Sequence, residues 1–282
     1  MRIAVDGPLD LQATLESGQA FRWRREDGWY GGVVFSNAVL LRRTARGIEF
    51  RSTPEDEEAL AEHLVDYLGL SDDLDAIYRS IAVDEHLKAA IRRYRGMRIL
   101  RQDPWECLVS FICSAWSNVH RVSGNIEAIA SRFGEPVHQD GGTRHAFPSP
   151  NELAAADEAA LRILGLGFRA KYVPHTAELV ASGEVNLLTL REASYDDALR
   201  VVLSLPGVGD KVANCVLLFS LDKREAFPVD VWIQRVLCDL YLGGAGRKMS
   251  TRTLRLWAQD HFGPYAGYAN HYLFHDRRLA AR

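Results

Sequence analysis

Cysteine is scarce in this sequence, and no two cysteines are close together. The chain has 282 residues and no C-x-x-C spacing. Secreted disulfide scaffolds need dense cysteines, and iron–sulfur and structural zinc sites use clustered ones. We therefore expect a protein of a reducing compartment with no disulfide and no metal site. The four cysteines stand at positions 107, 113, 215 and 238.

Long apolar runs are also missing. No window approaches the roughly 18 apolar residues of a membrane-spanning helix. The start of the chain, MRIAVDGPLDLQ, has no apolar run of signal-peptide length. This predicts no secretion signal and no membrane partner, and it places the protein in the cytoplasm, or on the nucleoid if the source is prokaryotic.

A general excess of positive charge is absent as well. The chain has 34 basic and 37 acidic residues, a net charge of -3 and a pI near 6.3, so its overall charge does not indicate a nucleic-acid binder. One local run differs, because residues 88–102 hold several arginines and no acid. Taken alone, such a run is most simply a solvated helix face.

The residues that are present indicate an α+β protein of two domains. Hydrophobic residues make up 47% of the chain, which is enough for a substantial core, and 282 residues exceed the usual size of a single core. Helical periodicity begins at residues 56–70 and resumes near residue 74. We expect a β-rich domain over residues 1–90 and a helical body over residues 91–282. Short strands of an antiparallel meander are expected at 21–24, 29–35, 38–43 and 48–52.

Two later helix starts carry strong signals. Asp103 and Ser149 are each followed by proline and, three residues on, by glutamate, the pattern of an N-cap with proline in the first turn. Between the two helical groups, residues 134–150 are expected to form a long loop. The sequence shows no internal repeat and no low-complexity tract.

The stretch LPGVGDKVANC, residues 205–215, joins two helical patterns through a glycine-rich turn. Gly207 and Gly209 permit positive φ and expose main-chain N–H groups, and Asp210 is expected to cap the second helix. A helix–hairpin–helix of this kind binds a phosphate backbone without reading sequence. A tight turn between two packed helices is the simpler alternative.

Lys211 and Asp230 favour chemistry at this hairpin. A lysine in the first turn of an apolar helix can attack carbon and form a Schiff base, provided that its amine is uncharged. Asp230 begins the next apolar helix, where a helix N-terminus stabilises a carboxylate, and it could support positive charge on a sugar as a base departs. A plain N-cap role for Asp230 is compatible with this.

Several motifs together resemble the 8-oxoguanine DNA glycosylase branch of the helix–hairpin–helix glycosylase superfamily. The resemblance covers nearly the whole chain, and it implies a β-rich N-terminal domain similar to half of a TATA-binding protein attached to a helical body. It also implies that a damaged nucleotide is flipped out of the duplex, that Lys211 attacks the sugar, and that Asp230 supports departure of the base. The motifs are SGQAFRW (17–23), RILRQDPWECLVSFICS (98–114), LGLGFRAKYV (164–173), LPGVGDKVANC (205–215), FPVDV (227–231) and GPYAGYANHYLF (263–274).

The resemblance also implies which residues recognise the base. The carbonyl of Gly18 would accept the N7 hydrogen that distinguishes 8-oxoguanine from guanine. Cys215 and Phe274 would sandwich the base, and Asn270 would lie at its Watson–Crick edge. Without the family match, Cys215 and Phe274 would simply be core residues.

On the duplex side, Phe168 corresponds to the family's wedge, and Arg121 and Arg169 correspond to arginines that contact the orphaned cytosine. The chain departs from the family at Trp116, where the pattern has asparagine, and at Trp232, where better-known members have a phosphate-contacting histidine. These departures bear on the preference for cytosine opposite the lesion more than on the chemistry.

The expected partner is double-stranded DNA containing oxidised guanine, bound by a monomer. No organic cofactor is expected, and a monovalent cation at the hairpin carbonyls of Leu205 or Val208 is an option by analogy. One alternative is a glycosylase for another oxidised base, as in endonuclease III, although such proteins usually carry a four-cysteine cluster that this chain lacks. The other is a non-catalytic helix–hairpin–helix DNA-binding protein, which would need neither Lys211 nor Asp230.

Overall fold

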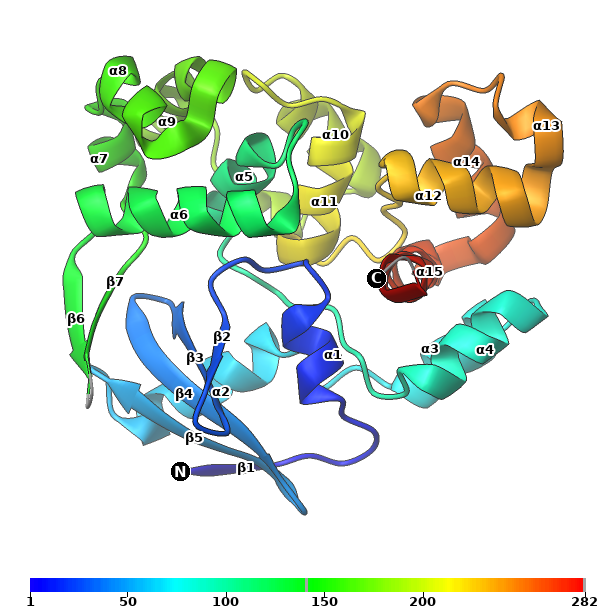
Figure 1. Cartoon of the computed structure of the whole chain (residues 1–282), viewed down its shortest axis with the longest axis horizontal. Coiled ribbons are helices and arrows are strands. Elements are labelled where there is room, and N and C mark those ends of the chain that lie inside the picture. Colours follow the sequence, from blue (N-terminus) through cyan, green and yellow to red (C-terminus); the bar gives the residue numbers. More distant parts are fainter. Residues whose placement is uncertain (140–141, 281–282) are drawn as a thin grey trace.

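The computed structural model describes residues 1–139 and 142–280. It confirms the α+β class and the meander, because a five-stranded antiparallel sheet of order β1-β5-β4-β3-β2 forms the N-terminal part (Figure 1). The first predicted strand begins only at Arg24, since the side chains of Phe21 and Trp23 are buried in two different cores. The strands are β1 (Arg2–Ala4), β2 (Arg24–Glu26), β3 (Trp29–Val34), β4 (Asn37–Thr44) and β5 (Gly47–Thr53).

The helical body follows the sheet and forms most of the upper half of Figure 1. Asp103 and Ser149 are confirmed as N-caps, and Ser149 forms a complete capping box with Glu152. Within the described ranges, no helix has the length and hydrophobicity that crossing a membrane requires. The α-helices are α1 (Leu11–Glu16), α2 (Glu57–Tyr67), α3 (Leu74–Ile81), α4 (Glu85–Arg93), α5 (Pro104–Cys113), α6 (Val119–Phe133), α7 (Pro150–Ala154), α8 (Glu158–Leu161), α9 (Tyr172–Ala181), α10 (Tyr195–Leu203), α11 (Asp210–Ser220), α12 (Val231–Val236), α13 (Gly243–Gly246), α14 (Thr251–Phe262) and α15 (Ala266–Ala280).

The expected loop at 134–150 contains two short strands, β6 (Pro136–Gln139) and β7 (Gly142–His145). They run from the helical body to the sheet (Figure 1). Gln139 Nε2 donates to the carbonyl of Ala38 at 3.1 Å, and Arg144 pairs with Glu26 at 2.9 Å. These strands are short and polar, so their sequence has no apolar alternation that would predict them.

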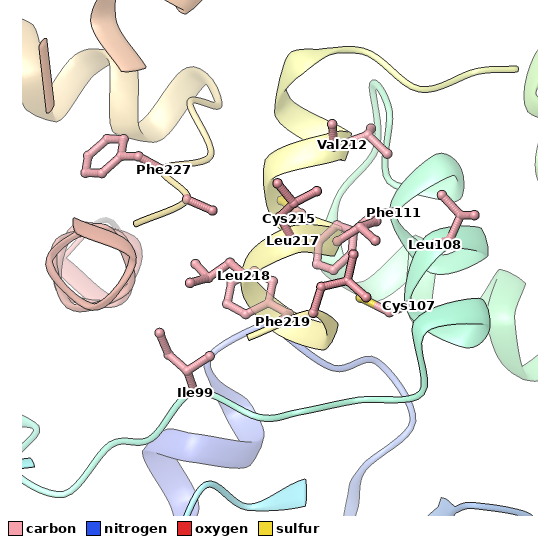
Figure 2. Packing of buried hydrophobic residues seen from close by; sticks show 14 of the residues in the cluster. Ile99, Cys107, Leu108, Phe111, Val212, Cys215, Leu217, Leu218, Phe219 and Phe227 are labelled. Atoms are coloured by element: carbon pink, nitrogen blue, oxygen red, sulfur yellow. The ribbon is translucent and has the colours of Figure 1, made fainter. Parts of the chain in front are cut away.

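Two large hydrophobic clusters hold the fold together, and a third, small one joins β4 to the β6–β7 hairpin. The smaller of the two large clusters lies between the sheet, α1 and α2. The larger one fills the helical body and includes residues of α3 and α4, so these two helices share the core of the later part of the chain. Figure 2 shows the centre of the larger cluster, where Cys215 and Phe219 of α11 meet Phe111 and Leu108 of α5.

The basic run at 88–102 divides into two parts, which corrects its interpretation as one solvated face. Arg92, Arg93 and Arg95 are exposed, but Arg98 is only 1% exposed and donates to the carbonyls of Pro8, Gly69 and Asp72. Buried guanidinium groups need such partners. The end of the run therefore joins the N-terminal domain to the helical body.

Asp72 is the carboxylate at this junction. Its side chain accepts bonds from Arg101 at 2.7 Å, Arg224 at 2.8 Å and the hydroxyl of Tyr268 at 2.7 Å. Tyr268 belongs to α15, while Asp72 lies between α2 and α3. This network therefore fixes the position of α15, a helix that lines the candidate active site, relative to the N-terminal domain.

Candidate active site

One cavity of about 380 Å³ lies between the N-terminal domain and the helical body. Its walls come from the segment after α1, the segment joining α5 to α6, helix α11, the start of α12 and helix α15. The structure brings together here the residues expected to act on the sugar and to hold the base, and with them Trp232, which was expected to contact DNA. They are Gly18, Lys211, Cys215, Asp230, Trp232, Asn270 and Phe274.

The helix–hairpin–helix is formed by α10 and α11. Gly207 has φ +77°, and a Cβ there would lie 2.7 Å from Cγ of Tyr172, so the turn requires glycine for both conformation and space. Gly209 has open space around it and occupies the N-cap position of α11. Asp210 is therefore not the N-cap that the sequence predicted, and its carboxylate instead pairs with Arg255 at 3.1 Å.

The Asp210–Arg255 pair belongs to a network that braces the hairpin. Arg255 is 4% exposed and also donates to the hydroxyl of Tyr195 at 3.0 Å. That hydroxyl donates to Asn214, whose amide nitrogen donates to the carbonyl of Asp210 at 2.8 Å. Helices α10, α11 and α14 are thereby tied together behind the lysine. No local sequence pattern predicts this network, because Tyr195 and Arg255 lie far apart along the chain.

Lys211 extends from the first turn of α11 into the cavity. Its Nζ donates to Oγ of Ser114 at 2.8 Å and lies 5.0 Å from the centroid of the Phe111 ring. Ser114 follows α5 and is fixed by its own bond to the carbonyl of Phe111 at 2.7 Å. The lysine is thus held by a neutral hydroxyl and an aromatic face. Sequence reasoning did not identify Ser114 as its partner.

Asp230 is confirmed as the N-cap of α12, because its Oδ1 accepts the N–H of Ile233 at 2.8 Å. Burial raises the pKa of this carboxyl above its usual range, while the bond from Ile233 and the positive charge of Lys211 oppose the rise. The helix N-terminus thus offsets part of the cost of a carboxylate in a sheltered site.

The remaining walls of the cavity are mostly apolar. Burial raises the pKa of the Cys215 thiol to about 11, against the lowering effect of Lys211, so Cys215 offers an uncharged surface at neutral pH. Asn270 is 4% exposed, and its Nδ2 donates to the carbonyl of Pro228 at 2.8 Å. Phe274 is partly exposed, and the Arg278 guanidinium lies 5.7 Å from its ring.

Gly18 contributes main chain to the cavity. Its φ is +92°, and a Cβ there would lie 2.8 Å from Nη1 of Arg278 and 3.4 Å from Val119. Only glycine adopts this conformation at low cost.

His271 was not predicted, and it lines the same cavity. It is 2% exposed, and Nε2 has no hydrogen-bond partner among the residues that the structure describes. Burial lowers its pKa to about 3, with further lowering by His275 and Arg278, so the imidazole is uncharged at neutral pH. It follows Asn270 in the sequence, but a single histidine in an apolar helix gives no signal that separates a site residue from a core residue.

The predicted duplex-facing residues form a second group outside this cavity. Trp116 is 94% exposed and Phe168 is 47% exposed. Arg121 is exposed and donates from Nη2 to the carbonyl of Gly165 at 3.3 Å. Arg169, in contrast, is 4% exposed and bonded to main-chain carbonyls. The structure therefore places one of the two predicted arginines at the surface and the other inside.

Known proteins match the chain along its length. Residues 2–108 match the family described as the N-terminal domain of 8-oxoguanine DNA glycosylase, and residues 109–259 match the HhH-GPD superfamily of base excision DNA repair proteins. A protein of Methanothermobacter thermautotrophicus, named as a probable N-glycosylase/DNA lyase, is 32% identical over 99% of this chain and 96% of its own length.

Solved structures agree with this match. The structure of MBOgg1 in complex with a low-affinity DNA ligand has a TM-score of 0.92 and 36% identity, and covers 100% of this chain and 96% of that one. The Clostridium acetobutylicum 8-oxoguanine glycosylase/lyase, in complex with double-stranded DNA containing cytosine opposite 8-oxoguanine, has a TM-score of 0.91 and 29% identity, and covers 100% and 99%. The chain therefore belongs to the 8-oxoguanine DNA glycosylase family of the HhH-GPD superfamily of base excision repair proteins.

Proposed function

We propose that this protein excises 8-oxoguanine from double-stranded DNA and then cleaves the abasic site by β-elimination. It is a DNA glycosylase and AP lyase by family. The observation that carries the specific reaction is the meeting of Lys211 and Asp230 in one cavity with the residues expected to hold a base. A binding module would need the hairpin but not this pair of side chains.

Lys211 supplies the nucleophile in this proposal. Its uncharged amine attacks C1′ of the sugar, and the bond from C1′ to the base breaks with its electron pair leaving on the base. Opening of the sugar ring then gives an imine between C1′ and Nζ. Removal of a proton from C2′ expels the 3′ phosphate, which is the β-elimination. Ser114 positions Nζ through the bond that it accepts at 2.8 Å.

Asp230 stabilises the positive charge that develops on the sugar as the base departs. A preorganised charge in a sheltered site does this better than water does. Its N-cap bond to Ile233 fixes the orientation of the carboxylate before substrate arrives. We assign no nucleophilic role to Cys215, because its pKa of about 11 keeps the thiol protonated.

The flipped base would occupy the cavity with its faces against Cys215 and Phe274, and Asn270 at its Watson–Crick edge. The carbonyl of Gly18 would accept the N7 hydrogen of 8-oxoguanine, which guanine lacks. The buried state of Cys215 and Asn270, each below 5% exposed, supports a rigid pocket rather than an adaptable one. Trp232 would flank the entrance beside Asp230, in place of the family's histidine.

Gly207 and Gly209 would hold a DNA phosphate through the main chain of the hairpin. A monovalent cation at the same turn would neutralise that phosphate, with carbonyls as its ligands. The carbonyl of Leu205 already accepts the N–H of Val208 at 3.2 Å and retains a second lone pair. Among the residues that the structure describes, no group of three or more His, Cys, Asp or Glu side chains could hold a metal ion.

Borohydride trapping tests the proposal. The protein is incubated with a duplex containing one 8-oxoguanine opposite cytosine, and reductant is added. We expect a covalent protein–DNA band that Lys211→Gln abolishes and that Lys88→Gln, a change on the exposed face of α4, leaves unchanged. A duplex with guanine at the same position should give no band.

Other outcomes would separate the alternatives. Base release without a trapped band would mean a monofunctional enzyme and would remove the nucleophile role from Lys211. A band only with oxidised pyrimidines would point to a glycosylase for another base. Tight duplex binding without release of any base would mean that the hairpin serves a non-catalytic DNA-binding protein.

A further inference from the structure

The β-elimination step of the proposed function needs a group that accepts the proton of C2′. Lys211 is occupied as the imine at that stage, and the Cys215 thiol, with a pKa of about 11, is protonated. The Asp230 carboxylate caps α12 and stabilises the positive charge of the sugar, so its protonation would weaken both interactions. The proton acceptor therefore has to be another residue of the cavity wall.

The other titratable side chains among the described residues of that wall are His120, His271 and Arg278. An arginine in a protein keeps its protons. His271 is 2% exposed, its Nε2 is buried, and burial lowers its pKa to about 3, so its imidazole is a weak base. His120, in contrast, is exposed. A side chain that lines the cavity and is also exposed lies where the cavity opens, and a nucleotide entering there can reach it.

His120 lies in the first turn of α6, on the same segment that holds the nitrogen of Lys211. Ser114, at the start of this segment, accepts the bond from Nζ at 2.8 Å. Once the imine has formed, C2′ is two bonds away from Nζ, so the proton acceptor has to lie near the lysine. Figure 1 shows that α6 begins on the side of α11 and runs away from it toward β6, and both helices contribute to the cavity wall.

The turn between α5 and α6 is fixed by hydrogen bonds to its main chain. The N–H of Ser117 donates to the carbonyl of Ser114 at 3.2 Å. From another loop, Arg169 donates to the carbonyls of Ala115 at 2.6 Å and Trp116 at 2.9 Å. Trp116 is held at φ +53°, which is a costly conformation for a bulky residue. These bonds fix the first turn of α6 relative to the oxygen that binds the lysine.

We propose that His120 is the general base of the β-elimination, a role for which imidazole is the side chain most often used. This inference rests on the proposed function, because only a lyase carries out this step. A monofunctional glycosylase would release the base and leave His120 without a proton to accept.

The step starts from the protonated imine between C1′ and Nζ. The imidazole of His120 takes the proton from C2′, the electrons of the C2′–H bond form a double bond between C1′ and C2′, and the imine electrons return to Nζ as a lone pair. That lone pair then re-forms the imine, the double bond shifts to C2′ and C3′, and the bond from C3′ to its oxygen breaks. The phosphate leaves with those electrons, and His120 passes its proton to water.

A duplex with a preformed abasic site opposite cytosine isolates this step, because no base has to be released. Single-turnover strand cleavage is measured beside the fraction of the DNA that borohydride traps on the protein. We expect His120→Gln to slow cleavage at least about 100-fold, the lower end of what a positioned general base contributes. The trapped fraction should rise, because the imine still forms and is consumed more slowly.

The rise of the imine separates a general base from a residue that only shapes the cavity, whose loss would lower imine formation and cleavage together. Added imidazole should restore part of the cleavage by His120→Ala, where the missing side chain leaves space, and should not restore cleavage by Lys211→Gln. His138→Gln is the matched control, because His138 is an exposed histidine of β6 that does not line the cavity. Its cleavage rate and trapped fraction should equal those of the wild type.

Failure of the inference differs from failure of the proposed function. If His120→Gln slows cleavage by less than about 100-fold, or if its imine and its cleavage fall together, His120 is not the general base, and the wild-type protein still stands as a glycosylase and lyase. A wild-type protein that traps no imine on the abasic duplex and releases no 8-oxoguanine would refute the proposed function itself.

Discussion

The cavity and the duplex-facing loops present their side chains in opposite ways. Cys215 and Asn270 in the cavity are 3% and 4% exposed, whereas Trp116 in the loops is 94% exposed. The cavity derives its shape from helices packed in the larger hydrophobic cluster (Figure 2). The loops derive theirs from the bonds of Arg169 to main-chain carbonyls.

The two regions also differ in how closely they follow the family pattern. Lys211, Asp230 and Gly18 in the cavity match it, whereas Trp116 in the loops and Trp232 at the cavity depart from it. Burial restricts the cavity residues, because a change there must preserve packing. An exposed loop tolerates a change of residue type. Changes in the cavity should therefore alter the reaction, and changes in the exposed loop should leave stability almost unchanged; the predictions below test that difference.

The largest effect should come from Asp230, where two roles meet in one side chain. Asn is as good an N-cap as Asp, so Asp230→Asn should keep the bond to Ile233 and lose the charge. We expect base release to fall by roughly 10²–10³-fold, as for other removals of one preorganised electrostatic group. Thermal stability should hardly change. Single-turnover rates and a melting curve measure the two quantities.

Asp230→Ala is the matched variant for that comparison. It should lose the same activity and, in addition, about 1 kcal/mol of stability from the missing cap. An Asp230→Asn protein that keeps its rate within tenfold would show that the carboxylate serves only as a cap. The cavity would then owe its chemistry to Lys211 alone.

A smaller effect is expected from Gly18→Ala. At φ +92° an alanine costs about 1–2 kcal/mol, and its Cβ would press on Arg278 at the edge of the cavity. Release of 8-oxoguanine should fall roughly 10- to 100-fold, because small displacements of a positioning group cost rates of this order. Urea unfolding and single-turnover release measure both effects.

Gly7→Ala provides the matched control. Gly7 has φ +96°, and a Cβ there would meet nothing within 4 Å. The two variants should therefore lose similar stability, and only Gly18→Ala should lose activity. Equal activities would mean that the conformation at Gly18 serves the fold and that its carbonyl does not contact the base.

The burial of His271 predicts that the stability of the protein depends on pH. The pKa of this histidine in the folded protein is about 3, against an unfolded value near 6.5. As the pH falls below about 6.5 the unfolded chain binds a proton that the folded protein does not, so the free energy of unfolding falls. The slope is at most about 1.4 kcal/mol per pH unit, and it continues until the pH reaches the folded pKa.

His271→Asn removes the titrating group and should flatten that slope. Between pH 7 and pH 5 the wild-type protein should lose about 2 kcal/mol more stability than the variant does, as measured by urea midpoints. His86→Asn, on the exposed face of α4, should keep the wild-type slope. Identical slopes for wild type and His271→Asn would place a compensating partner or water at the imidazole.

The sequence predicted the chemistry-bearing residues better than it predicted their partners. The strand alternation predicted the sheet, and the proline and glutamate after Asp103 and Ser149 predicted the caps, because these signals are local. Lys211 and Asp230 were identified by their motifs. Ser114, which holds Lys211, lies 97 residues away from it, and no local pattern encodes such a contact.

The errors have the same physical origin. Asp210 looked like an N-cap, yet Arg255 of α14 competes for its carboxylate. Arg98 looked solvated, yet carbonyls from segments before α1 and after α2 surround it. In both cases the local sequence is compatible with two environments for the side chain, and a partner distant in sequence determines which one it adopts. The conformation of Trp116 belongs to this class too, because Arg169 maintains it from another loop.

The smallest effect should be that of Trp116→Asn on stability, and it separates the two regions most cleanly. The side chain is 94% exposed, so its removal costs almost no burial, and Asn tolerates φ near +53° better than Trp does. We expect the free energy of unfolding to stay constant or to rise by up to about 1 kcal/mol. Phe35 has a similar φ, but the centroid of its ring lies 6.3 Å from that of Tyr67. Phe35→Asn should therefore lose stability. A marked loss from Trp116→Asn would mean that this ring supports the fold, whereas a stable but slow enzyme would show that the loop maintains a costly conformation for the DNA alone.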